Sequence, residues 1–168
     1  MQETKLYTLN FSQLKTYLFA GAFILGNILL PQICHLMPNG GRIWLPIYFF
    51  TLVGAYKYGW KVGLMTAILS PIFNSLLFGM PALAMLPIVL TKSMLLAVVA
   101  GFAAHRFNRF SLPILFLVVL AYQCVGSLLE WAMVGNFSAA MQDFTMGFPG
   151  MLFQIVGGYL ILKLLADK

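Results

Sequence analysis

The chain has 168 residues, of which 61% are hydrophobic and only 8% are charged. A soluble domain of this length carries roughly a quarter of its residues as charged side chains, so the composition excludes a soluble globular protein. Ten Lys and Arg residues against four Asp and Glu residues give a formal net charge of +6. The chain is therefore expected to lie in a lipid bilayer.

Six apolar segments are suited to crossing a hydrocarbon core about 30 Å thick, which takes about 20 residues per helix. In chain order they are Lys15–Cys34, Ile43–Tyr56, Lys61–Phe78, Ala82–Ala104, Leu112–Val134 and Phe148–Leu165. Runs of this length, unlike alternating strands of about ten residues, exclude an outer-membrane barrel. The connections are too short to hold a soluble domain. We expect residues 1–168 to form a single all-α integral membrane domain with six transmembrane helices.

The basic residues indicate how the chain is oriented. With a cytoplasmic N-terminus, the outer side receives only Arg42, and eight basic residues fall inside: Lys5, Lys15, Lys57, Lys61, Arg106, Arg109, Lys163 and Lys168. Cytoplasmic loops carry this excess of Lys and Arg, so both termini are predicted to be cytoplasmic. Membrane topology accounts for the positive charge, and no nucleic-acid partner is expected.

Lys92 and Glu130 are the two acidic or basic side chains placed well within the predicted spans. A charged side chain at mid-membrane costs about 2.5–3.5 kcal/mol on insertion scales, so each should face protein or water and have a partner. Their spans run in opposite directions, and helical side chains lean toward their own N-terminus. The two charged groups should approach a common depth in the outer half, either bonded directly or lining a cavity open to the outside.

Other polar residues lie at a similar depth. Gln123, Ser127 and Glu130 form a stripe on one helix face, and Gln154 and Asn74 add amides from the sixth and third spans. Such a group predicts a lined pocket for a ligand, although interhelical packing is the alternative.

Aromatic residues add two further candidates. Trp44 and Trp131 lie near the outer boundary, either as part of an aromatic belt or stacked on a flat ligand.

No metal or cofactor is expected. Cys34 and Cys124 lack metal-ligand spacing and are interpreted as buried small hydrophobic residues. Cys34 and His35 provide at most two ligands for a soft metal, which do not make a site.

The chain also lacks enzyme signatures. HExxH, GxSxG, paired-Asp and Walker sequences are all missing, so no enzyme and no ATPase activity of its own is expected.

Small residues on the fourth span, Ser93, Ala97, Gly101 and Ala104, favour close contact between helices.

Two stretches resemble the substrate-binding S components of energy-coupling factor (ECF) transporters. The first is PNGGRIWLPIYFFTLVGAYKYGWKVGLMTAILSPIFNSLLFGMP (Pro38–Pro81), with a Gly-containing first loop, an LP pair entering the second helix and a basic, Gly-containing hairpin. The second, LPIVLTKSMLLAVVAGFAAHRF (Leu86–Phe107), is similar to the fourth helix of that family, which ends in small residues before a basic turn.

The resemblance implies an S-component-like bundle in the cytoplasmic (inner) membrane. Such a protein binds a small water-soluble vitamin or vitamin precursor with high affinity near the outer face. Its partners would be the ECF coupling transmembrane protein and two ABC ATPases, which drive the subunit to tip over in the membrane. The family docks on the coupling protein through small residues of the first helix, and Ala22 and Gly26 are the nearest equivalents.

In this interpretation Lys92 receives an anionic group of the ligand and Glu130 a cationic or hydroxyl group. Gly40, Gly41, Arg42 and Trp44 then form part of a mobile lid. The main alternative is a structural or scaffold membrane protein with no small-molecule cargo. A membrane enzyme with an unrecognised motif is a further alternative.

Overall fold

The computed structural model describes residues 6 and 8–166, and all regular secondary structure within them is helical. Lys5 and Lys168, both expected on the cytoplasmic side, lie outside the described residues. The long helices are α1 (Leu14–Cys34), α4 (Trp60–Phe78), α5 (Leu86–Phe107), α6 (Leu112–Val134) and α9 (Phe148–Ala166). The short elements are α2 (Gly40–Trp44), η1 (Pro46–Tyr48), α3 (Phe49–Tyr58), α7 (Phe137–Ala140) and α8 (Gln142–Thr145).

Five helices of the described chain are long and apolar enough to cross a membrane, and they are the five long ones named above. Their outer faces carry large apolar side chains that no other part of the chain covers, such as Leu18, Leu29 and Leu164, each more than 60% exposed. A water-soluble protein rarely leaves so much apolar surface open. The chain is therefore an all-α, multi-pass membrane protein.

The predicted second span, Ile43–Tyr56, is not a single helix. Its residues are divided among the end of α2, η1 and the greater part of α3. The break falls at Leu45, whose backbone is left-handed with φ of 46°, immediately before Pro46. Proline has no N–H to donate and restricts the residue that precedes it, so the helix cannot run through this point.

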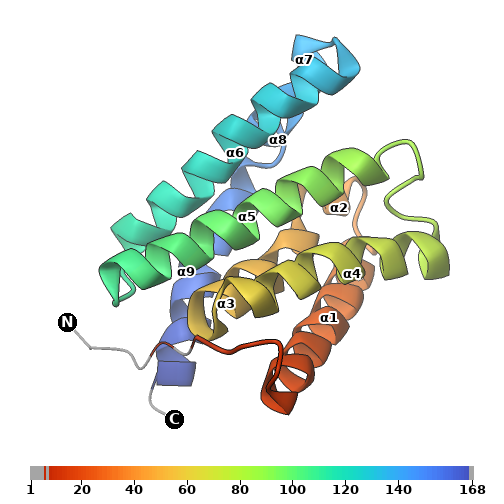
Figure 1. Cartoon of the computed structure of the whole chain (residues 1–168). Helices are drawn as coiled ribbons and strands as arrows, with labels where there is room; N and C mark the ends of the chain where they lie inside the picture. The colour runs from red at the N-terminus through yellow and green to blue at the C-terminus, as the bar shows by residue number, and fades with distance from the viewer. Residues whose placement is uncertain (1–5, 7, 167–168) are drawn as a thin grey trace.

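The α3 helix is the centre of the fold. It is enclosed by α1, α4, α5 and α9 (Figure 1), and Leu52, Val53 and Ala55 have no exposed surface. This burial explains why α3 is mostly apolar, unlike a helix with one face toward water, and its polar residues Thr51 and Lys57 are buried too.

A buried hydrogen-bond network connects α1, α3 and α4. The Asn27 side-chain amide donates to Thr51 Oγ1 at 3.1 Å and Ser70 Oγ at 3.3 Å. Its Oδ1 accepts the main-chain N–H of Phe50 at 3.1 Å. Asn74 Nδ2 donates to the main-chain carbonyl of Asn27 at 2.9 Å. These bonds fix how the three helices are rotated about their axes.

The fourth predicted span starts later than expected, at Leu86 rather than Ala82. Pro87 occupies the first turn of α5, where a missing N–H costs least, and residues before it form a turn. The small-residue stripe of α5 packs inside the bundle, as its spacing indicated: a Cβ on Gly101 would overlap Trp60 of α4.

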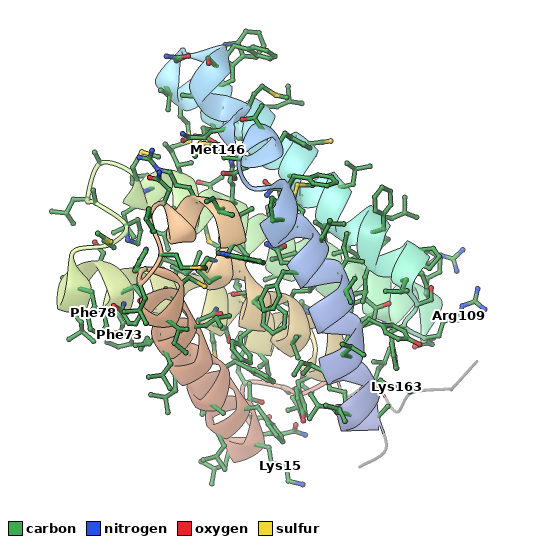
Figure 2. All side chains as sticks on the ribbon, turned by 180° about the vertical axis from the view of Figure 1, so that it is seen from behind. Lys15, Phe73, Phe78, Arg109, Met146 and Lys163 are labelled. Atoms are coloured by element: carbon green, nitrogen blue, oxygen red, sulfur yellow. The ribbon has the colours of Figure 1, made fainter. Side chains whose placement is uncertain are left out.

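The two ends of the bundle differ in charge. The start of α1 and the end of α9 lie at the same end (Figure 1). Figure 2 shows Lys15, Lys163 and Arg109 toward this end and Met146 near the other. We call the first the basic end and the second, which carries α2, α7 and α8, the loop end. Three further basic residues lie at helix ends: Lys57 in the last turn of α3, Lys61 in the first turn of α4 and Arg106 in the last turn of α5.

Candidate functional site

Three charged side chains meet at the loop end, inside the bundle. Lys92 Nζ of α5 lies 2.5 Å from Glu130 Oε2 of α6 and 2.7 Å from Asp143 Oδ2 of α8. The Lys92 and Glu130 side chains are only 2% and 8% exposed, whereas Asp143 is 19% exposed. We call these three residues the ion cluster. The predicted approach of Lys92 and Glu130 is confirmed.

A glycine makes room for the lysine. A Cβ placed on Gly126 of α6 would lie 2.8 Å from Lys92 Cγ and 3.4 Å from Lys92 Cε, too close for undisturbed packing. The aliphatic stem of Lys92 therefore runs directly over Gly126, and its ammonium group reaches Glu130 one turn further along α6. This contact holds a flexible side chain in one conformation.

A cavity of about 730 Å³ lies beside the ion cluster. It is bounded by the α1–α2 segment, η1, the α4–α5 loop, the first turns of α5, and α6 and α8. Small-molecule sites range over about 300–1,000 Å³ and combine apolar walls with a few polar groups. The cavity fits that description, because Leu45, Ile88 and Val89 provide apolar surface and all three ion-cluster residues contribute to its wall.

The segment predicted as a lid borders the cavity. Gly40, Gly41 and Arg42 all line it, and Arg42 is exposed. Gly40 needs to be glycine, since a Cβ there would overlap the carbonyl oxygen of Cys34. The sharp return from α1 to α2 brings Arg42 to the cavity, and it also depends on left-handed Asn39, with φ of 56°.

Six predicted binding residues do not line the cavity, and three of them, Asn74, Trp44 and Trp131, have other packing roles. Asn74 is buried between α1 and α4, where its amide bonds to the carbonyls of Asn27 and Ser70, so its role is in helix packing. Trp44 packs edge-on against Phe153 with ring centroids 6.2 Å apart.

Trp131 is 46% exposed and packs edge-on against Phe137 at 5.5 Å. It points out of the bundle because it lies about 100° around α6 from Glu130, whose side of the helix faces the interior.

Gln123, Ser127 and Gln154 form a second polar group that does not line the cavity. All three are buried in the bundle, and Gln123 and Ser127 share the inward face of α6 with Glu130. Gln154 Oε1 accepts a hydrogen bond from Tyr122 at 2.8 Å. No described group pairs with the remaining polar atoms, namely both amide atoms of Gln123, the Ser127 hydroxyl and Gln154 Nε2. Buried polar groups normally have partners, so these atoms are suited to bind water or a ligand.

Asp143 is the site residue that sequence reasoning missed. It lies in the connection Gly135–Gly150, outside every predicted span, and the short helix α8 folds it back onto the bundle. One signal was present, because Asp143 is the only acidic residue between Glu130 and the last span.

Asp143 gives Lys92 a second partner, and the expectation that Lys92 receives an anionic ligand group stays a prediction. The Lys92 ammonium group is already bonded to two carboxylates, so it has little positive charge left for an anionic ligand group. With both carboxylates ionised, the ion cluster has a net charge of −1. The interior of the site therefore favours a cation.

The prediction that both cysteines are buried is wrong for one of them. Cys34 is buried as expected, but Cys124 is exposed because it lies on the outward face of α6.

Ala22 is exposed, and Gly26, one turn further along α1, is partly exposed and close to α3: a Cβ there would lie 2.7 Å from the Phe50 ring. The docking role of this pair stays a prediction.

Within the described residues, no group of three His, Cys, Asp or Glu side chains is arranged to hold a metal ion.

Comparisons of the chain with protein-family models, with curated proteins and with solved structures give no match.

Proposed function

We propose that this protein is the membrane-embedded, high-affinity substrate-binding subunit of an uptake system for a small water-soluble vitamin or vitamin precursor. The observation that supports it is the cavity at the loop end, with the ion cluster in its wall. Buried charges within a membrane bundle are costly, and where they border a cavity they commonly mark the path of a polar substrate. The resemblance of Pro38–Pro81 and Leu86–Phe107 to ECF S components suggests the same function.

The proposed topology has six passages and cytoplasmic termini in the cytoplasmic membrane. In it, η1 (3 residues) and α3 (10 residues) form the short second passage. Together they are only about 20 Å long at 1.5 Å per residue, less than a bilayer core. This length is sufficient because α3 is surrounded by other helices rather than by lipid. The cavity then opens on the outer side, opposite the basic end.

Transport in this proposal depends on partners. The ligand enters the cavity from outside and is held by the cavity wall and by the segment around Arg42. An ECF coupling transmembrane protein with two ABC ATPases then reorients the loaded subunit and releases its cargo inside. The exposed apolar face of α1, which includes Leu18, Leu25 and Leu29, is the surface offered to the coupling protein.

A scaffold without cargo is the second candidate, and one observation favours it. Lys92 is already paired with Glu130 and Asp143 inside the protein. This is expected of an ion cluster that only fixes the positions of α5, α6 and α8. The two candidates differ in one respect: a substrate-binding subunit holds a small molecule in the cavity, and a scaffold does not.

The test is to purify the protein from its native host in mild detergent and record native mass spectra. A binding subunit should carry a small molecule, released on denaturation, or should purify with ATPase subunits. Ile88→Trp, which fills the cavity, should abolish the bound mass, whereas Val98→Trp should retain it because Val98 lies on the outer face of α5. Spectra with neither a small molecule nor ATPase subunits would refute the proposed function.

A further inference from the structure

The charges that border the cavity are separated by sign. At its buried end, Glu130 and Asp143 share a single ammonium group, that of Lys92. At its exposed end, Arg42 lines the wall, and no described carboxylate lies within ion-pair distance of its guanidinium group. Counting these four side chains, the buried end has a charge of −1 and the exposed end a charge of +1.

The two ends belong to one compartment. Arg42 and the ion-cluster residues line the same cavity. The backbone also brings them together, since a Cβ on Gly147 would lie 2.6 Å from the Asp143 carbonyl oxygen and 3.2 Å from that of Arg42. A single small molecule can therefore approach both charges at once.

We propose that the cavity binds a zwitterionic small molecule, with its ammonium group inward against Glu130 and Asp143 and its anionic group outward near Arg42. An added ammonium group makes the ion cluster neutral, with two positive and two negative charges. The opposite orientation would place an anion against the excess carboxylate and a cation beside Arg42, which is unfavourable at both ends. This inference rests on the proposed function and specifies the ligand class of the same site.

The first experiment measures the charge separation without any ligand. In a chain with Cys34→Ala and Cys124→Ala, single cysteines are introduced by Ile88→Cys, at the inner wall, or Met37→Cys, at the segment of Arg42. Each is treated with a cationic and an anionic methanethiosulfonate reagent. The cationic reagent should react about tenfold faster than the anionic one at position 88, because a cleft of one sign concentrates counter-ions. The preference should reverse at position 37. Equal rates at position 88, or faster reaction of the anionic reagent there, would overturn the proposal.

The second experiment uses three aromatic probes of similar size: 4-(aminomethyl)benzoate as the zwitterion, 4-methylbenzylamine as the cation and 4-methylbenzoate as the anion. Calorimetric titration should show that the zwitterion binds about tenfold tighter than either singly charged probe. Asp143→Asn should weaken the zwitterion and the cation but not the anion, and Arg42→Gln should weaken the zwitterion and the anion but not the cation. Lys163→Gln, at the basic end, is the matched charge control and should change none of the three.

The anion binding as tightly as the zwitterion would overturn the proposal, and so would the binding of none of the probes. Failure of the zwitterionic-ligand proposal can be told apart from failure of the proposed function. A protein that purifies with a bound anionic or uncharged molecule would still be a substrate-binding subunit but would refute the zwitterionic ligand. Co-purification with ATPase subunits would support the proposed function whatever the three probes show.

Discussion

Removing the positive charge of the ion cluster is the most direct perturbation of this site. Lys92→Met keeps most of the apolar stem over Gly126 but leaves Glu130 and Asp143 facing the same space with no counter-ion. Breaking a buried ion pair by removing one partner costs about 3–5 kcal/mol. The remaining carboxylates are only 8% exposed at Glu130 and 19% exposed at Asp143, so water screens their repulsion less than at the protein surface. We therefore expect a loss of stability in this range.

The assay is thermal unfolding of the detergent-solubilised protein, followed by circular dichroism. A loss of 3–5 kcal/mol corresponds to a fall in Tm of about 6–20 °C, at about 2–4 °C per kcal/mol for a chain of this size. Lys163→Met makes the same chemical change at an exposed position and should shift stability by less than about 0.5 kcal/mol.

Neutralising the whole cluster provides the complementary test. The triple variant Lys92→Met, Glu130→Gln and Asp143→Asn removes all three charges and should recover most of the lost stability, because replacing a buried ionic group with neutral residues is often close to neutral. If Lys92→Met unfolds at the same temperature as the unchanged protein, the ion cluster is not the buried, mutually dependent group described above. Ligand affinity retained in Lys92→Met, Glu130→Met would remove both residues from the binding site.

Further predictions concern packing and unpaired polar groups, all measured by the same thermal unfolding assay. Gly126→Ala should cost about 1–3 kcal/mol because its methyl group would displace the stem of Lys92. Gly21→Ala in α1, where a methyl group meets nothing within 4 Å, should be neutral or slightly stabilising. Asn27→Leu should cost about 1–3 kcal/mol by leaving the partly buried main-chain N–H of Phe50 without an acceptor. Unchanged stability would contradict the network between α1, α3 and α4. Gln123→Met should leave stability unchanged or raise it, since no described group pairs with the amide. A loss above about 1 kcal/mol there would indicate that bound water or ligand satisfies the amide.

The membrane character of the chain and the positions of five long helices followed from the sequence. Hydrophobic length is a local property, so runs such as Leu112–Val134 can be recognised without knowing their neighbours. The same holds for the proximity of Lys92 and Glu130, which needs only opposite helix directions and the lean of side chains along a helix. Local geometry was insufficient at Ile43–Tyr56, where the backbone turns at Leu45.

The composition of the site was decided by tertiary structure. Helical periodicity places Gln123, Ser127 and Glu130 on one face of α6, but it does not determine which of them reaches a cavity. Only the packed bundle separates Glu130, which lines the cavity, from the two deeper residues. Asp143 lies in a connection whose path no periodic pattern fixes, and it joins the ion cluster because α8 packs between α6 and α9. The sequence alone places Lys92 and Glu130 within membrane-spanning segments. Long-range packing decides that Asp143 joins them.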